Sequence, residues 1–331
     1  MKSNKIVITH WVHQEIIDLL SPYGELLLNQ SRETLPPEKV LIRMRDAHAM
    51  MAFMPDCVDA VFLRRCPHLK VIGAALKGFD NFDVAACTRR GVWLTIVPDL
   101  LTIPTAELAI ALMLALVRNM GAGDRWVRSG DFQGWQPVFY GSGLSGATVG
   151  ILGMGRVGCA IARMLSGFET RILYYDASPL DSRHDQELHA RSVPLDELLG
   201  HSDYIICALP LDERTRHLID DRAIAVMRPG SYLINVGRGS VVDEQDVAVA
   251  LEKGMLAGYA ADVFEMEDWA LADRPRFITP ALLAHKDKTF FTPHLGSAVD
   301  RIRKKIAVEA AHNIIDALEG KRPRRAVNTI E

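Results

Sequence analysis

Short apolar runs alternate with longer mixed segments over the first hundred residues. In the mixed segments the apolar positions recur every three or four residues, which predicts helices, whereas the short β-branched runs predict buried strands. Strands are predicted at residues 6–9, 25–28, 49–53, 71–75 and 92–95. Helices are predicted at residues 13–20, 37–45, 58–65 and 82–90. This part of the chain therefore forms a small α/β unit.

The alternation resumes after one long helix and one loop. The helix is predicted at residues 106–120, and residues 131–145 form a polar loop that carries several aromatic side chains. Further strands are predicted at residues 148–152, 170–176, 205–208, 232–236, 258–262 and 289–292. The last helix, residues 297–318, is too short to form a domain of its own, so we expect it to pack on the N-terminal unit.

A glycine fingerprint stands at the first of these later strands. Gly153, Gly155 and Gly158 have the spacing G-x-G-x-x-G between an apolar strand and a helical pattern. The next strand ends in Asp176, where a βαβ unit places a carboxylate on the ribose hydroxyls of a dinucleotide. That carboxylate would repel the extra phosphate of NADP. The predicted cofactor is therefore NAD.

The fold class follows from these patterns. We expect an α/β protein with two domains: an NAD-binding Rossmann domain built on a doubly wound parallel sheet, and a smaller flavodoxin-like α/β domain for the substrate. The Rossmann domain would comprise residues 101–293. The substrate domain would be discontinuous, with residues 1–100 and 294–331.

Composition excludes several classes of protein. The net charge of −3 over 331 residues leaves no basic surplus for nucleic acid or an anionic membrane. Five cysteines without metal-ligand spacing favour reduced thiols in the cytoplasm and predict no metal site. The apolar runs are too short to span a bilayer, and the N-terminus does not resemble a signal peptide.

Three residues that follow predicted strands could carry chemistry. Arg238 has a guanidinium group that fits an anionic substrate, and His294 could exchange a proton near neutral pH. Glu267 could stabilise the charged imidazole if the two side chains meet. Taken singly, each could be an ordinary surface or loop residue. Their shared position at the carboxyl ends of strands favours a site.

At this point the chain resembles the D-isomer-specific 2-hydroxyacid dehydrogenases. The resemblance rests on residues 153–158, 176, 209–211, 215–219, 227–230, 236–244, 262–264 and 292–296. It implies an NAD-dependent enzyme, commonly a homodimer, whose catalytic residues are Arg238, Glu267 and His294. Only the family spacing selects Glu267 over Glu265. Residues 106–145 resemble the part that joins subunits.

The resemblance also implies the residues that would contact NAD. They are Lys77, Leu101, Thr105, Gly153, Gly155, Arg156, Val157, Gly158, Asp176, Ala208, Leu209, Pro210, Val236, Gly237, Arg238, Asp262, His294 and Gly296.

Several stretches depart from the general family and resemble its phosphite (phosphonate) dehydrogenases. These are residues 50–56, 75–83, 132–141 and 264–270. We therefore expect oxidation of phosphite to phosphate, with water as nucleophile and His294 as base. The predicted substrate-binding residues are Met54, Lys77, Gly78, Trp135, Tyr140, Arg238, Ser297 and Arg303. Lys77 would balance the charge of phosphite beside Arg238, although it could also be a solvated loop residue.

Two other functions remain open on the sequence. One is a D-2-hydroxyacid dehydrogenase or glyoxylate/hydroxypyruvate reductase, which would share the same three catalytic residues. The other is a non-enzymatic NAD-sensing binding protein, which could dispense with them.

Overall fold

The computed structural model describes residues 4–330 and divides into two compact units. Unit 1 contains the residues up to Leu101, the short segment Trp269–Ala272 and the residues from Ser297 onward. Unit 2 contains Thr102–Asp268 and Asp273–Gly296. Its second segment ends at Gly296, so the loop around His294 belongs to unit 2. The predicted α/β fold is confirmed.

Unit 1 is an α/β unit with a five-stranded parallel sheet within the described residues. Its strands are β1 (Asn4–Ile8), β2 (Gly24–Leu28), β3 (Ala49–Ala52), β4 (Val71–Ala74) and β5 (Trp93–Thr95). Its helices are α1 (Gln14–Leu20), η1 (Ser21–Tyr23), α2 (Pro37–Met44), α3 (Ala60–Arg64), α4 (Val84–Arg89) and α13 (Asp300–Leu318).

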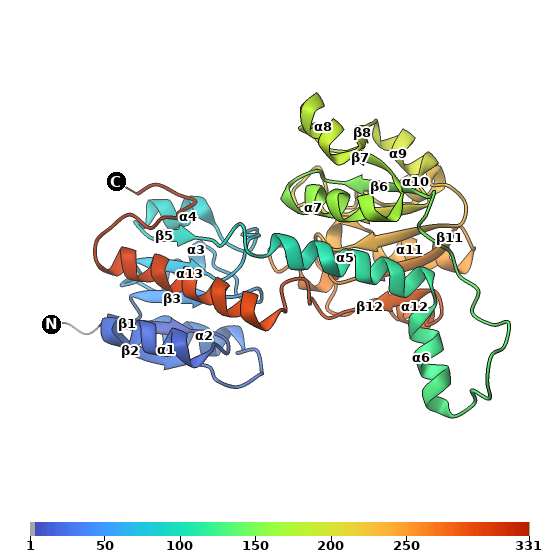
Figure 1. Cartoon of the computed structure of the whole chain (residues 1–331). Coiled ribbons are helices and arrows are strands. Elements are labelled where there is room, and N and C mark those ends of the chain that lie inside the picture. Colours follow the sequence, from blue (N-terminus) through green and yellow to red (C-terminus); the bar gives the residue numbers. More distant parts are fainter. Residues whose placement is uncertain (1–3, 331) are drawn as a thin grey trace. The chain divides into compact units, whose positions relative to one another are not determined.

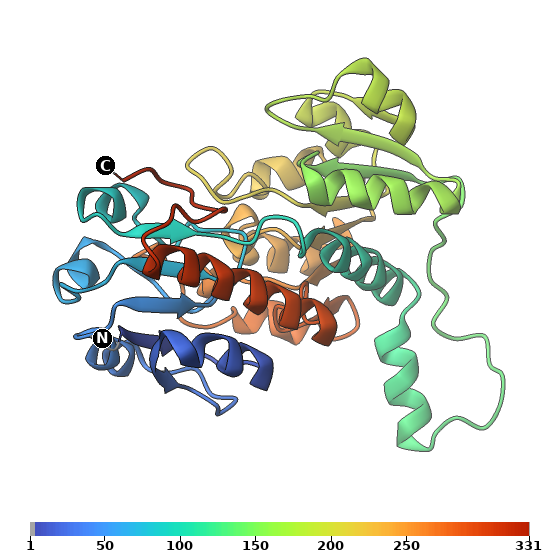
Figure 2. The ribbon, with the colours of Figure 1, turned by 60° about the vertical axis from the view of Figure 1, so that its left-hand side comes forward.

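The strands of unit 1 lie in the order β2-β1-β3-β4-β5, which is the flavodoxin-like order. Alternate residues of β1 face opposite sides: Ile6 and Ile8 pack with α1 and α13, whereas Val7 packs with α2, α3 and α4. Figures 1 and 2 show α13 lying along one face of this sheet beside α1. The last helix therefore packs on the sheet of the N-terminal unit.

Unit 2 contains the larger sheet. Its strands are β6 (Thr148–Leu152), β7 (Arg171–Tyr175), β8 (Ala190–Ser192), β9 (Tyr204–Cys207), β10 (Ser231–Asn235), β11 (Leu256–Ala261) and β12 (Thr289–Phe291). Its α-helices are α5 (Thr102–Val117), α6 (Met120–Ser129), α7 (Arg156–Leu165), α8 (Ser182–Leu188), α9 (Leu195–His201), α10 (Asp221–Val226), α11 (Glu244–Glu252) and α12 (Pro280–Ala284). Short 3-10 turns are η2 (Ser166–Phe168), η3 (Gly239–Val241) and η4 (Glu265–Glu267).

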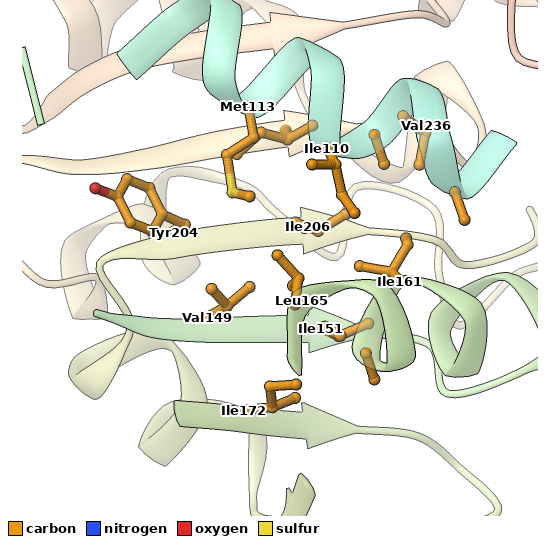
Figure 3. Close-up of a cluster of buried hydrophobic side chains, with 14 of the residues drawn as sticks. Ile110, Met113, Val149, Ile151, Ile161, Leu165, Ile172, Tyr204, Ile206 and Val236 are labelled. Carbon is orange, nitrogen blue, oxygen red and sulfur yellow. The ribbon is translucent and has the colours of Figure 1, made fainter. Parts of the chain in front are cut away.

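The seven parallel strands described in unit 2 have the order β12-β11-β10-β9-β6-β7-β8. This is the Rossmann order with one added edge strand. Helices α5 and α7 cover one face, and Figure 3 shows Ile110 and Met113 of α5 above Ile151 and Ile206 of the sheet. Helices α9, α10, α11 and α12 cover the other face. The order reverses beside β6, where open α/β sheets place ligands at the carboxyl ends of the strands.

The predicted helix at residues 106–120 is wrong at its end. Helix α5 ends at Val117, and Asn119 adopts a left-handed conformation (φ 53°) before α6 begins. The chain bends by 62° between the two helices. The side-chain amide of Asn119 donates hydrogen bonds to the carbonyl oxygens of Phe139 and Tyr140, which ties the bend to the loop after α6. Apolar periodicity alone did not reveal this break.

No single helix within residues 4–330 is both long enough and apolar enough to cross a membrane. Among the helices that the structure describes, only α5 and α6, which form a bent pair, meet that requirement when taken together, and they do so by length and composition alone.

Candidate active site

Glu267 and His294 meet at the carboxyl edge of the unit 2 sheet. Glu267 ends the turn η4 that follows β11, and His294 follows β12. Oε2 of Glu267 lies 2.7 Å from Nδ1 of His294. Each side chain is about a quarter exposed, at 24% and 27%. Because Nδ1 faces the carboxylate, Nε2 is the ring nitrogen that can exchange a proton with a substrate.

Asp262, at the end of β11, holds the loop that carries His294. Its carboxylate accepts hydrogen bonds from the hydroxyl of Thr292 (2.6 Å) and from the backbone N–H groups of Leu295 (2.6 Å) and Gly296 (2.8 Å). The His294 N–H donates to the Asp262 carbonyl, and His294 has a φ of 56°. Burial raises the pKa of Asp262, against the effect of these hydrogen bonds. A loop held by these hydrogen bonds can keep the backbone of His294 in the left-handed conformation.

Arg238 lies in the turn between β10 and η3. Buried Asn235 organises this turn, because its amide donates to the Arg238 carbonyl and its oxygen accepts from the Gly237 N–H. A Cβ on Gly239 would lie 1.9 Å from the carbonyl carbon of Phe264, so only glycine fits there. The arginine therefore leaves the sheet from a rigid backbone.

The glycine fingerprint forms the loop between β6 and α7. Gly153 has a φ of 95°, and a Cβ there would lie 2.9 Å from the Ala208 carbonyl oxygen. A Cβ on Gly158 would lie 2.1 Å from the Gly153 carbonyl oxygen, so the helix packs close to the strand. A Cβ on Gly155 would have no described atom within 4 Å, and this residue precedes α7. The open side of the loop at a helix N-terminus fits a pyrophosphate.

Asp176 follows β7 and faces the same loop. Oδ2 accepts a hydrogen bond from the Met154 N–H at 2.7 Å, and Oδ1 accepts one from the Ser178 N–H at 2.8 Å. The carboxylate therefore stands beside the glycine loop, where a ribose of the dinucleotide would bind.

The other residues predicted to contact the cofactor are distributed over several loops. Arg156 and Val157 begin α7, Ala208, Leu209 and Pro210 follow β9, Val236 and Gly237 follow β10, Thr105 lies in α5, and Leu101 lies in unit 1. The β9 and β10 loops are in contact, since a Cβ on Gly237 would lie 2.5 Å from the Leu209 carbonyl oxygen. The Thr105 hydroxyl donates to the Gly296 carbonyl at 3.3 Å.

Five of the predicted substrate-binding residues lie in unit 1: Met54, Lys77, Gly78, Ser297 and Arg303. Met54 and Lys77 come after β3 and β4. Arg303 donates to the carbonyl of Ala75 (3.4 Å) and the hydroxyl of Ser297 (3.3 Å), and burial lowers its pKa. These contacts place Arg303 at the carboxyl edge of the unit 1 sheet.

Trp135 and Tyr140 lie on the loop after α6, in unit 2. Their exposed fractions are 83% and 77%. Within the described chain they belong to a surface loop, and neither is part of the Glu267–His294 pair.

Sequence reasoning missed another histidine-carboxylate pair in this unit, close to the Glu267–His294 pair. Nε2 of His217 lies 3.0 Å from Oε2 of Glu265, two residues before Glu267. The two glutamates therefore have different partners. His217 lies in residues 215–219, one of the stretches that carry the family resemblance, but no role was predicted for it and nothing in the spacing connected it to Glu265.

Comparison with known proteins agrees with this geometry. Residues 110–296 match the model of the D-isomer specific 2-hydroxyacid dehydrogenase, NAD binding domain. The chain belongs to the D-isomer-specific 2-hydroxyacid dehydrogenase family. It is an NAD-dependent oxidoreductase with a Rossmann domain, so the non-enzymatic alternative does not apply.

The relatives of this dehydrogenase match it over nearly the whole chain. It is 36% identical to a glyoxylate reductase of Pyrococcus furiosus, over 98% of this chain and 95% of the relative. Among solved structures, a glyoxylate reductase from Paecilomyes thermophila has a TM-score of 0.84 and 27% identity, covering 99% of each chain. D-lactate dehydrogenase from Aquifex aeolicus, complexed with NAD and lactic acid, has a TM-score of 0.83 and 25% identity, covering 99% of this chain and 100% of that one.

These dehydrogenase relatives contradict phosphite as the substrate. The prediction rested on Lys77 as a second cation and on four short stretches, whereas the similarity to glyoxylate reductases extends over nearly every residue. A lysine after a strand can balance any small anion, a carboxylate included. Lys77 therefore does not distinguish phosphite from a 2-oxoacid.

Proposed function

We propose that this enzyme reduces a short 2-oxoacid of the glyoxylate class with NADH and oxidises the corresponding 2-hydroxyacid in the reverse direction. The Glu267–His294 pair, at 2.7 Å in the unit that also holds the glycine fingerprint, is the observation that carries the proposal. The names of the relatives that match the whole chain favour glyoxylate over other acids.

In this proposal Arg238 holds the substrate. A 2-oxoacid presents a planar carboxylate next to its carbonyl group, and a guanidinium can bind such a carboxylate through two parallel hydrogen bonds. Binding in this way would fix the orientation of the carbonyl carbon. The rigid turn held by Asn235 keeps the arginine in place during the reaction.

His294 supplies the proton. NADH, when bound, supplies a hydride for the carbonyl carbon. Nε2 of the charged His294 donates its proton to the carbonyl oxygen as the C–O double bond becomes single, which yields the 2-hydroxyacid. Glu267 stabilises the imidazolium before transfer and orients the ring through Nδ1. In the oxidative direction neutral Nε2 takes the hydroxyl proton.

A substrate panel tests the proposal. NADH consumption would be followed with glyoxylate, hydroxypyruvate and pyruvate, and NADH formation with NAD and glycolate, D-glycerate or D-lactate. We expect turnover of glyoxylate or hydroxypyruvate, with the 2-hydroxyacid as product. An enzyme that binds NADH but turns over none of these acids would overturn the proposal.

We further propose that unit 1 is the substrate-binding domain and that Lys77 supplies a positive charge for the substrate. Five of the predicted substrate-binding residues belong to this unit. Lys77→Ala should then raise KM for the oxoacid strongly and leave KM for NADH nearly unchanged. An unchanged oxoacid KM would assign Lys77 to a solvated loop role.

Finally, we propose that the enzyme is a homodimer joined through α6 and the loop at residues 131–145. Figures 1 and 2 show this segment projecting from the rest of unit 2. It carries exposed apolar side chains, among them Met120, Val127, Trp135 and Tyr140. Such a concentration favours a protein interface. Light scattering should give twice the chain mass, and Trp135→Asp should shift the protein toward the monomer; a monomeric wild type would refute the interface.

A further inference from the structure

His217 connects two turns that carry proposed catalytic residues. Its backbone N–H donates to the carbonyl of Ser240 in η3 at 2.7 Å, and its ring meets Glu265 in η4 at 3.0 Å. Nδ1 lies 3.5 Å from a carboxylate oxygen of Asp243. His217 has a φ of 48°, a conformation uncommon outside glycine. Contacts of its backbone N–H and of both ring nitrogens therefore hold His217 in place.

Glu265 is held equally firmly. Its Oε1 accepts a hydrogen bond from the Glu244 N–H at 2.9 Å, and its own N–H donates to a carboxylate oxygen of Glu244 at 2.8 Å. Its Oε2 faces His217, so both carboxylate oxygens have partners. The side chain is only 13% exposed. This reciprocal pair joins η4 to the first turn of α11.

The turns η3 and η4 also touch directly. A Cβ on Gly239 would lie 2.2 Å from the backbone nitrogen of Glu265, and the Ser240 N–H donates to the Asp268 carboxylate at 2.7 Å. Arg238 immediately precedes η3, and Glu267 ends η4. Any displacement of one turn must therefore disturb the residue carried by the other.

We propose that Glu265, braced by His217, is a positioning residue that fixes Glu267 against His294 and η4 against the Arg238 turn. This inference rests on the proposed roles of Arg238, Glu267 and His294. Neither Glu265 nor His217 touches substrate in this scheme. They act through the backbone of two short turns, which lack the extended hydrogen bonding of a longer helix.

Substitutions at Glu265 separate positioning from general stability. Glu265→Ala removes the acceptor for both partners, whereas Glu265→Gln retains an oxygen for the Glu244 N–H and an amide that can donate to a neutral His217 ring. The matched control is His184→Gln, since His184 pairs with Asp181 at 2.8 Å on the exposed helix α8. Wild type and variants would be assayed for kcat, both KM values and NADH affinity by fluorescence.

We expect Glu265→Ala to lower kcat by roughly ten- to a hundredfold, because small displacements of catalytic groups are that costly. NADH affinity should stay close to wild type. Glu265→Gln should recover most of the lost kcat, and His184→Gln should match wild type. Wild-type kcat in Glu265→Ala would overturn the proposal. If that variant does not fold, His217→Gln decides, with lowered kcat expected and unchanged kcat overturning the inference.

A spectroscopic readout does not depend on the substrate. The proton that His294 shares with Glu267 should give a downfield NMR signal in histidine-labelled protein, assigned by its loss in His294→Asn. Glu265→Ala and His217→Gln should shift or broaden that signal, and His184→Gln should not. An unmoved signal in both would overturn the positioning role. Absence of oxoacid turnover by wild type would instead refute the proposed function.

Discussion

Oδ2 of Asp176 accepts a hydrogen bond from the backbone N–H of Met154 at 2.7 Å. Asp176, directly after β7, thus helps to shape the glycine loop, in addition to its predicted contact with a ribose of the cofactor. Its two effects, one through a hydrogen bond and one through charge, can be separated by substitution.

Asp176→Asn and Asp176→Ala should change the cofactor preference in the same way and differ in their effect on KM for NADH. Both remove the negative charge that repels a 2′-phosphate, so both should increase kcat/KM with NADPH relative to NADH. Asn can still accept from Met154, so only Ala should raise KM for NADH substantially. The measurement is kcat/KM with each cofactor. Unchanged selectivity in both variants would mean that the ribose is recognised elsewhere.

His294→Asn should lower kcat by roughly 100- to 10,000-fold, the usual contribution of a positioned general acid. The glycine loop and Asp176 remain intact, so NADH binding, followed by fluorescence, should be nearly unchanged. His184→Asn, on the surface of α8, is the matched control and should retain wild-type turnover. Substantial activity in His294→Asn would remove this residue from the chemistry.

Glu244→Gln should stabilise the protein at alkaline pH. Glu244 is 3% exposed, and Oε2 has no hydrogen-bond partner among the described residues. Burial raises its pKa to about 7, with a smaller contribution from the charge of Glu265. The folded state therefore keeps a proton that the unfolded chain has already released, so this group makes stability fall as pH rises from about 4.5 to about 7.

The cost at pH 8 is on the order of 3 kcal/mol. Glutamine cannot ionise and can still accept from the Glu265 N–H. Thermal unfolding should show a higher Tm for Glu244→Gln than for wild type at pH 8 and little difference at pH 5. Glu252→Gln, exposed at the end of the same helix, should leave Tm unchanged at both values. A gain that is equal at pH 5 and pH 8 would contradict the assignment.

Gly239→Ala should impair both folding and turnover. The added methyl would overlap the backbone of Phe264 and Glu265, which cannot move aside as a flexible side chain can. We expect a loss of stability of roughly 1–3 kcal/mol from overpacking, with a lower kcat because η3 and η4 would separate. Gly254→Ala is a useful contrast, since its Cβ would meet no described atom within 4 Å although its φ of 71° adds strain. Wild-type kcat in Gly239→Ala would argue against the contact.

The sequence predicted the sheets and the cofactor loop because these depend on local patterns. Apolar runs reveal parallel strands buried on both faces, and three glycines with the spacing G-x-G-x-x-G after such a run reveal the turn that leads into a helix. The bend at Asn119 was missed because the apolar periodicity of α5 continues up to it. It depends on hydrogen bonds to residues twenty positions away.

The candidate site was predictable to a lesser degree. The position of His294 directly after a predicted strand indicated that it belongs to a site. Only the structure shows that Asp262 holds the loop around His294 through three hydrogen bonds to its carboxylate. Likewise, Glu265 and Glu267 are two glutamates in the same turn, and only the structure shows that the first pairs with His217 and the second with His294. Substrate identity was the weakest prediction, because a cation such as Lys77 selects for charge and not for the atom that bears it.

Arg238, Glu267 and His294 all lie with the glycine loop in unit 2, although the chain leaves and re-enters that unit. A lineage could therefore replace residues of unit 1 without altering the proposed machinery for hydride and proton transfer. Acids of different size or charge could be accommodated in descendants while the reaction stayed the same. Under the proposed division of labour, diversification of substrates in such an enzyme is expected to appear first as variation at positions such as Met54, Lys77 and Arg303.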